Sequence, residues 1–328
     1  MKKYLSKLLM AMCGLGSANA APLFFSVPGA VQTNAFAVSN SGAVVGYFED
    51  AQLAVHGFQY SNGTLSYIDA PNTIKGNGYG TVVTGINDAG MMVGYAYISS
   101  TEVYAFEYDG SSFHAVGTNG LGLVPTSISN SGVVSGYSQS STGFILAGNS
   151  LQTNSGPNTF FTGGAADGNV LSGYRNSALG GSRGFTYSNG IFTDTPIEVG
   201  ASFSIPYDVN NAQQTVGYSY FGNGGTSFYY DGVSFFSLPV GWDAHSINDS
   251  GEIVGSYGFS GTNRSVAFIL NASDLVSGFD LTPPNVSGYP VVNPSTSQLL
   301  PEPETYPLLR AGLGLMGVVI RRSTSKQA

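Results

Sequence analysis

The segment Asn87-Asp88-Ala89-Gly90-Met91-Met92-Val93-Gly94-Tyr95 decides the fold of this chain. It joins a polar turn to a short apolar strand that ends in Gly-Tyr. Asn and Asp favour turns because their side chains bond to the nearby backbone and tolerate left-handed φ angles. Related segments occur six times, with Gly-Ser in place of Gly-Tyr in the last copy. Their anchor glycines are Gly46, Gly94, Gly136, Gly173, Gly217 and Gly255.

A second pattern follows each anchor glycine by about ten residues. It is a small residue followed by Phe, then any residue, and then Tyr or Leu two residues after the Phe. The phenylalanines are Phe58, Phe106, Phe144, Phe185, Phe228 and Phe268. Asn-Gly or Asp-Gly follows closely in four copies, at 62–63, 109–110, 189–190 and 231–232. These dipeptides favour two-residue hairpin turns, because both central residues of such a turn need a positive φ.

Each repeat therefore predicts two hairpins, which means four short strands in about 42 residues. That is the content of one propeller blade, and the strands are apolar on both faces, as Val44-Val45 illustrates. We predict an all-β fold, a β-propeller of about six four-stranded antiparallel blades over residues 21–270. Residues 24–29 are expected to complete the last blade, which has no clear strand after Ala267–Leu270. A seven-bladed propeller and an open β-solenoid are the alternatives.

The repeats resemble the HAF-type extracellular repeats of bacteria, in which a His-Ala-Phe tripeptide lies beside an Asn-Asp-x-Gly-x-Val-Val-Gly element. The resemblance covers residues 34–270, and His56-Gly57-Phe58 is the nearest match to the tripeptide. The other copies have no His at this position. The resemblance implies an architecture and no activity.

The N-terminus has the three regions of a secretory signal peptide, which we assign to residues 1–20. Lys2 and Lys3 supply the positive charge, and an apolar stretch follows. The small residues Ala18 and Ala20 match the signal cleavage pattern, so the mature chain is expected to start at Ala21. Cys13 is the only cysteine, so the mature chain is expected to contain no disulfide and no thiol nucleophile.

After the repeats, residues 271–300 are rich in Pro, Ser and Asn and predict a cap followed by a flexible linker. Residues 301–328 contain Pro301-Glu302-Pro303, an apolar run interrupted by Arg310, and Arg321-Arg322. This order resembles the PEP-CTERM sorting tail. The resemblance implies a short apolar sorting helix, an exosortase-type processing enzyme, transient membrane contact and a Gram-negative cell surface.

The composition narrows the classes of function. The 328 residues carry a formal net charge of -8, and only 9% of them are charged. Aromatic residues make up 12% of the chain, which argues against general disorder. Outside the two terminal segments the only basic residues are Lys75, Arg175, Arg183 and Arg264. Such an acidic body disfavours nucleic acid as a partner.

No metal or cofactor is expected. The Asn-Asp turns could suggest calcium, but they lack the alternating carboxylates and the terminal Glu of a calcium loop. Turn formation explains them better. His56, His114 and His245 lack the spacing of zinc ligands.

We also expect no enzyme and no catalytic residue. The pattern Gly180-Gly181-Ser182-Arg183-Gly184 matches a nucleophile elbow, but it leads into a strand rather than a helix. Asp69, Asp208 and Asp243 could in principle form the carboxylate pair of a glycan-cleaving enzyme. No spacing distinguishes them from ordinary loop acids.

Trp242 does not repeat, and residues that are unique on a repeat scaffold often mark the place of function. We predict Trp242 and Asp243 as ligand-binding residues. The first functional hypothesis is a secreted, non-enzymatic structural or adhesive component of the exopolysaccharide or biofilm matrix. The alternative is a propeller that binds a glycan or a protein at the surface. A carbohydrate-active hydrolase or lyase is the third hypothesis.

Overall fold

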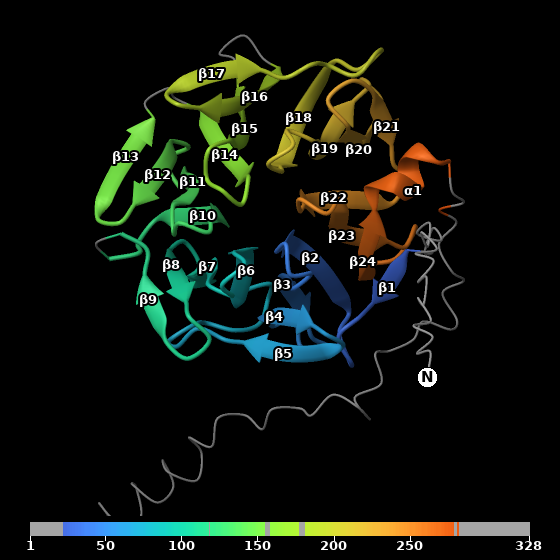
Figure 1. The fold of residues 1–328 in the computed structure, drawn as a ribbon. Coiled ribbons are helices and arrows are strands. Elements are labelled where there is room, and N and C mark those ends of the chain that lie inside the picture. The colour runs from blue at the N-terminus through green and yellow to red at the C-terminus, as the bar shows by residue number, and fades with distance from the viewer. Residues whose placement is uncertain (1–21, 118, 155–157, 177–180, 279–280, 282–328) are drawn as a thin grey trace, which may run out of the picture.

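The computed structural model describes residues 22–117, 119–154, 158–176, 181–278 and 281. The signal peptide (1–20), the sorting tail (301–328) and most of the linker lie outside these residues, so those assignments stay predictions. The described part is all-β apart from one short helix. Its sheets surround a central axis as in a β-propeller (Figure 1).

Each sequence repeat forms a four-stranded antiparallel unit. Unit 1 contains β2 (Gln32–Val38), β3 (Val44–Glu49), β4 (Val55–Ser61) and β5 (Thr64–Ile68). Unit 2 contains β6 (Thr81–Ile86), β7 (Met92–Tyr97), β8 (Val103–Tyr108) and β9 (Phe113–Ala115). Unit 3 contains β10 (Leu123–Ile128), β11 (Val134–Ser138), β12 (Gly143–Ala147) and β13 (Ser150–Asn154).

The second half of the ring has the same plan. Unit 4 contains β14 (Thr159–Gly164), β15 (Leu171–Asn176), β16 (Ser182–Ser188) and β17 (Ile191–Asp194). Unit 5 contains β18 (Phe203–Val209), β19 (Thr215–Tyr220), β20 (Gly225–Tyr230) and β21 (Phe235–Ser237). Unit 6 contains β22 (Trp242–Ile247), β23 (Glu252–Gly258), β24 (Ser265–Asn271) and, from the start of the chain, β1 (Leu23–Phe25).

The number of separate sheets differs from the prediction of about six. Units 2 to 5 are four separate four-stranded sheets, whereas units 6 and 1 form one eight-stranded sheet. The two halves of this sheet are joined by a single parallel residue pair, Gln32 with Ser265. Units 6 and 1 are joined in this way because β1 pairs with β24 in unit 6, and a short connection then leads directly into β2 of unit 1.

The expected completion of the last unit by the N-terminal segment is confirmed. β1 pairs antiparallel with β24, with Phe24 opposite Phe268. Phe24 and Phe25 are 7% and 1% exposed, so this pairing buries two aromatic rings as well as forming sheet hydrogen bonds. After unit 6 the chain forms the short helix α1 (Ala272–Val276), whose first turn is capped by the Asn271 side chain.

The two sequence patterns meet inside every unit. In each unit the anchor glycine on the second strand lies directly opposite the repeated Phe on the third strand. The pairs are Gly46–Phe58, Gly94–Phe106, Gly136–Phe144, Gly173–Phe185, Gly217–Phe228 and Gly255–Phe268. All six Phe side chains are at most 2% exposed. The glycine therefore leaves the space into which the Phe ring packs.

Gly94 shows why no larger residue fits. A Cβ there would collide with the carbonyl oxygen of Val82 on the inner strand and would lie 2.7 Å from the Phe106 ring. We expect Gly94→Ala to lower the free energy of unfolding by about 1–3 kcal/mol, the usual cost of overpacking. Chemical denaturation of the purified chain measures this.

Gly258→Ala is the matched control, because a Cβ at Gly258 meets nothing within 4 Å. Its effect should stay within about 0.5 kcal/mol. Equal stability of the two variants would contradict the packing role of the anchor glycine.

Candidate functional site: the central channel

Every inner strand carries a bulge of one residue at the same place. The register against the second strand shifts there, so one residue of the inner strand has no partner. These residues are Phe36, Thr84, Thr126, Thr162, Tyr207 and His245. All six line the central channel, which shows that the bulge directs one side chain per unit toward the axis.

Three consecutive units contribute threonines that link the units together. The Oγ1 of Thr84 donates to the Pro125 carbonyl oxygen at 2.7 Å. The Oγ1 of Thr162 makes the equivalent bond to the Pro206 carbonyl oxygen at 2.8 Å. Thr126 bonds to the next unit in the same way. This half of the channel wall is therefore polar, and its hydroxyl hydrogens are already used.

The other three units contribute aromatic rings. His245 lies between Phe36, at a ring-centroid distance of 4.9 Å, and Tyr207, at 6.0 Å. The Phe36 contact is edge-to-face and the Tyr207 contact is stacked. The channel thus has an aromatic wall from units 5, 6 and 1, which faces the threonine wall from units 2, 3 and 4.

The channel widens toward the ends of the inner strands that lie away from the Asn-Asp turns. This wide part is a cavity of about 330 Å³. The Gly-Tyr tyrosines Tyr95, Tyr137 and Tyr174 line it together with the bulge residues. Burial raises the pKa of these phenols, so their hydroxyls stay neutral near pH 7 and can both donate and accept hydrogen bonds.

His245 is also neutral near pH 7. Burial lowers the pKa of its imidazole, and the nearby Asp243 carboxylate, 3.5 Å from Nε2, opposes this only in part. The same carboxylate adds to burial in raising the pKa of Tyr207. The aromatic wall therefore carries no positive charge.

The Asn-Asp turns form a ring of side chains at the narrow end, which we call the girdle. Its five members occupy the same turn position and alternate in type except across unit 4. They are Asn40, Asp88, Asn130, Asn211 and Asp249. In unit 4 the turn is one residue longer, Ala166 holds this position, and the carboxylate of the neighbouring Asp167 accepts bonds from Asn169 of the same turn. Asn supplies amide donors and Asp supplies acceptors, so alternation lets neighbouring units bond to each other.

The hydrogen bonds of the girdle cross from unit to unit. The Asn40 side chain donates to Asp88 at 3.1 Å and to Asp249 at 2.8 Å. Asn130 donates to Asp88 at 2.6 Å, and Asn211 donates to Asp249 at 2.8 Å. Backbone N–H groups add to the ring, because Asn40 N–H donates to Asp88 and Asp249 N–H donates to Asn40. Between units 3 and 4 the backbone of Asn130 donates to the Ala166 carbonyl oxygen.

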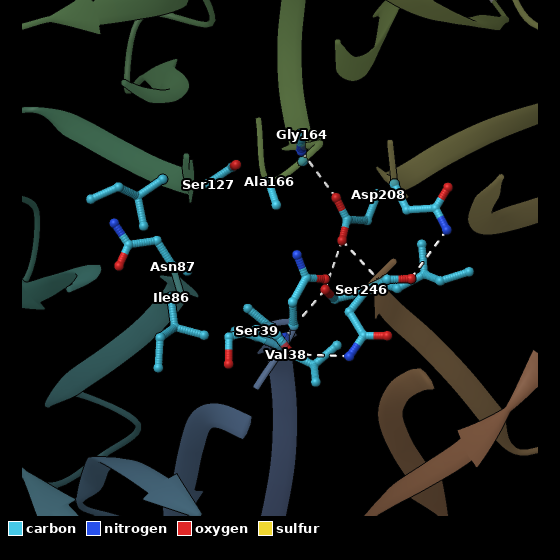
Figure 2. A pocket seen from close by; sticks show the side chains of 18 of the residues that line it. Val38, Ser39, Ile86, Asn87, Ser127, Gly164, Ala166, Asp208 and Ser246 are labelled. Carbon is cyan, nitrogen blue, oxygen red and sulfur yellow. Dashed lines mark hydrogen bonds between the residues drawn. The ribbon is translucent and has the colours of Figure 1, made fainter. Parts of the chain in front are cut away.

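Just above the girdle the narrow end holds a space of only about 50 Å³ (Figure 2). Buried Asp208 binds three units together there. Its carboxylate accepts bonds from Gly164 N–H at 3.0 Å, Ser246 Oγ at 2.6 Å and Ile247 N–H at 3.1 Å. Both carboxylate oxygens of Asp208 are thus used in hydrogen bonds between units, which gives this residue a structural role.

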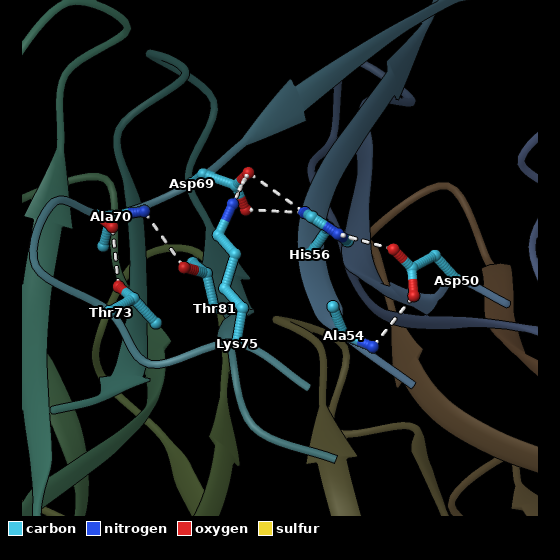
Figure 3. A network of polar contacts seen from close by, with 8 residues as sticks. All are labelled: Asp50, Ala54, His56, Asp69, Ala70, Thr73, Lys75 and Thr81. Atoms are coloured by element: carbon cyan, nitrogen blue, oxygen red, sulfur yellow. Dashed lines mark hydrogen bonds and ion pairs between the residues drawn. The ribbon is translucent and has the colours of Figure 1, made fainter. Parts of the chain in front are cut away.

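The three carboxylates considered for catalysis lie in different units and bind different partners. Asp69 contacts His56 Nδ1 at 3.0 Å and Lys75 Nζ at 2.6 Å, on the side of unit 1 (Figure 3). The Asp69 bond raises the pKa of His56, whose Nε2 lies 3.4 Å from Asp50. His56, the residue that matches the HAF tripeptide, is thus held in a local ion-pair network. No contact joins Asp69, Asp208 and Asp243 in the described part of the chain.

The predicted ligand residues Trp242 and Asp243 begin the inner strand of unit 6. Trp242 is only 3% exposed and packs against Phe24 and Phe268, with ring centroids 5.1 and 4.7 Å apart. Its ring is therefore part of the core. The Asp243 side chain is half exposed and accepts a bond from Ser227 Oγ at 3.2 Å. The ligand-binding role of both residues stays a prediction at this point.

Ser182, the serine of the elbow-like pattern, is the first residue of β16 and donates to Asn176 at 2.8 Å. A strand context does not match the strand-to-helix turn of a nucleophile elbow. Within the described ranges no group of three His, Cys, Asp or Glu could hold a metal ion. No helix in those ranges is long and apolar enough to cross a membrane.

No protein-family profile and no curated protein sequence matches this chain. The resemblances to HAF-type repeats and to the PEP-CTERM tail therefore stay sequence-based expectations. Among solved structures, the fold is similar to a lectin of Aleuria aurantia in complex with Fucα1-6GlcNAc. The TM-score is 0.43 and the identity is 12%, over 74% of this chain and 96% of that chain.

The fold is also similar to the β-propeller domain of the Trilobed protease from Pyrococcus furiosus. The TM-score is 0.46 and the identity is 7%, over 77% of this chain and 96% of that chain. For Pyrococcus horikoshii acylaminoacyl peptidase the TM-score is 0.39 and the identity is 8%, over 76% of this chain and 51% of that chain. Because these identities and TM-scores are low, the similarities do not indicate a function. The function of the chain has to be argued from its own residues.

The girdle predicts a specific stability effect. Asp88 accepts bonds from the Asn40 backbone, the Asn40 amide and the Asn130 amide, and Asp88→Asn would turn an amide donor toward one of these donors. We expect this variant to lose about 1–2 kcal/mol in the free energy of unfolding, as measured with urea.

Asp109→Asn is the matched control, because Asp109 accepts local turn bonds from Ser111 and Ser112, which an amide oxygen can also accept. Its contact with His114 Nε2 at 3.5 Å is solvent-exposed and contributes little to stability. Its loss should be smaller than that of Asp88→Asn. If both variants lose the same amount, the girdle contributes no more than an ordinary turn.

Asp208 predicts a pH dependence of stability. Burial raises the pKa of its carboxyl to about 6 despite its hydrogen bonds. Because the pKa of the folded state is then above the unfolded value of 3.8, its favourable contribution is complete below pH 4 and is lost as pH rises through 6. The protein should gain up to about 3 kcal/mol from this group between pH 7 and pH 4.

Asp208→Asn removes the titrating group and should remove that part of the pH slope, whatever its effect on absolute stability. Urea denaturation at pH 7, 6 and 5 measures both slopes. Parallel slopes for the variant and the wild type would show that Asp208 does not titrate in this range.

Proposed function

We propose that this chain is a non-enzymatic binding module that takes part of a glycan into the wide end of its central channel. The observation that carries the proposal is the lined cavity of about 330 Å³. This volume falls in the range of small-ligand sites, which is about 300–1,000 Å³. In this proposal the two halves of the eight-stranded sheet, units 6 and 1, are treated as two blades. Six blades then surround the cavity.

The lining suits a sugar because sugars have two kinds of surface. Their C–H faces pack on aromatic rings, which the wall of Phe36, Tyr207 and His245 provides. Their hydroxyls need partners that both donate and accept, which the neutral phenols of Tyr95 and Tyr137 provide. The binding alternative thus has more support from the geometry than the purely structural or adhesive hypothesis.

The absence of turnover is part of the proposal. Asp208 is buried and fully bonded, and Asp69 is held by His56 and Lys75. This leaves Asp243 without a second carboxylate in contact, whereas glycan cleavage generally uses two. Retention of an unmodified glycan after long incubation supports this part of the proposal.

The place of action is proposed from the terminal segments. We propose that residues 1–20 direct export and that residues 301–328 direct sorting to the surface of a Gram-negative cell by an exosortase-type enzyme. Extracellular polysaccharide or a surface protein would then be the partner. The mass of the exported chain tests this, because the mature protein should begin at Ala21.

The binding site is tested on a glycan array followed by calorimetry with a glycan that binds. Tyr137→Phe removes one hydroxyl from the cavity lining and keeps the ring. Loss of one neutral hydrogen bond should weaken binding about three- to tenfold.

Tyr67→Phe on β5 is the matched control, because Tyr67 is 48% exposed and lies outside the channel. It should bind like the wild type. Equal binding by Tyr137→Phe and the wild type would place the glycan elsewhere, and no binding to any array member would refute the proposed function.

A further inference from the structure

A side pocket opens next to the wide end of the channel, between units 5 and 6. It has a volume of about 250 Å³ and is lined by Tyr207, Tyr218, Ser227, Trp242 and Asp243, among others. Tyr207 belongs to the lining of both the pocket and the channel cavity. The two cavities are therefore neighbours that share Tyr207 as a common wall.

Asp243 is the only acidic residue among the lining residues, and no basic residue lines the pocket. The nearest basic neighbour of Asp243 is His245, whose Nε2 lies 3.5 Å away and which burial keeps neutral. The Lys and Arg ion pairs of the described residues use other acids, namely Asp69 for Lys75 and Asp194 for both Arg175 and Arg183. The Asp243 charge is therefore not balanced by a cation of the chain.

Aromatic groups surround this carboxylate. Tyr207 and Tyr218 line the same pocket, and the Asp243 charge contributes to the raised pKa of Tyr207 and of Tyr47. Trp242 completes the inner wall, and its buried indole N–H has no hydrogen-bond acceptor in the described part of the chain.

A carboxylate among aromatic rings favours a compact cation. An ammonium group gains charge-assisted hydrogen bonds from the carboxylate and attraction from the ring faces. An anionic substituent would be repelled by Asp243, and an N-acetyl group would leave the carboxylate unpaired. The wider body adds to this preference, because acidic residues outnumber basic ones.

We propose that the side pocket binds the protonated primary amine of an amino sugar, with Asp243 as its counter-ion. This inference rests on the proposed function, since it places the amine on the same glycan whose neighbouring part occupies the channel. It assigns the ligand class as a glycan with at least one free amino group. It also separates the roles of the two predicted ligand residues, because Asp243 contacts the amine and Trp242 forms the wall.

The experiment uses an array of paired glycans that differ only in whether the amine is free or N-acetylated, followed by calorimetry with the best pair. The wild type should prefer the free amine by about tenfold, the value of one charge-assisted contact. Asp243→Asn should reduce this preference to less than about threefold while binding of the acetylated partner changes little. The preference should also fall as salt is raised.

Glu102→Gln is the matched control, because it removes a carboxylate from the β7–β8 loop of unit 2, outside both cavities. It should keep the full preference for the amine. Equal or tighter binding of the acetylated glycans, or an amine preference that survives in Asp243→Asn, would overturn this inference and leave the proposed function standing. Binding of neither member of any pair would overturn both.

Discussion

Hydrogen bonding between the Asn-Asp turns of neighbouring units is the constraint on which the rest of the structure depends. A closed ring requires each unit to recognise two neighbours through the same turn position. An Asn amide placed between two Asp carboxylates satisfies this on both sides, as Asn40 does with Asp88 and Asp249. A ring of six identical Asp residues would repel itself, and a ring of six Asn residues would depend on the orientation of each amide.

The girdle fixes the ends of the inner strands, and the bulges then determine what faces the channel. Because each bulge directs one side chain toward the axis, the side chains at these six positions can differ while the strand pairing stays the same. Three threonines there join neighbouring units, and Phe36, Tyr207 and His245 form a continuous aromatic wall. The cavity and its side pocket thus lie on a rigid scaffold whose own packing depends on other positions.

The sequence predicted the repeat and the two hairpins of each unit, because these depend on local turn chemistry and on periodicity. The pairing of Gly94 with Phe106 could be expected from their spacing in most copies. The fusion of two units into one sheet could not, since it depends on a single contact between Gln32 and Ser265.

The channel residues were missed for a physical reason. A bulge is defined by the register between two strands, which no single strand reveals. A signal did exist, because Phe36, Tyr207 and His245 occupy the position where the other units have Thr. Trp242 was predicted as a ligand residue because it does not repeat. In the structure its ring packs against Phe24, so the residue also has a role in the core.

The pairing of β1 with β24 has a consequence for how the chain reaches this state. β1 is the first described strand to be synthesised, yet its partner is the last, so Phe24 meets Phe268 only after every other unit has been made. A nascent chain therefore holds two exposed aromatic rings near its start until the end of synthesis. Such a contact of very high sequence separation is entropically costly to form. Closure of the ring should be the final step of folding, and the chain must remain free of competing partners until that step is complete.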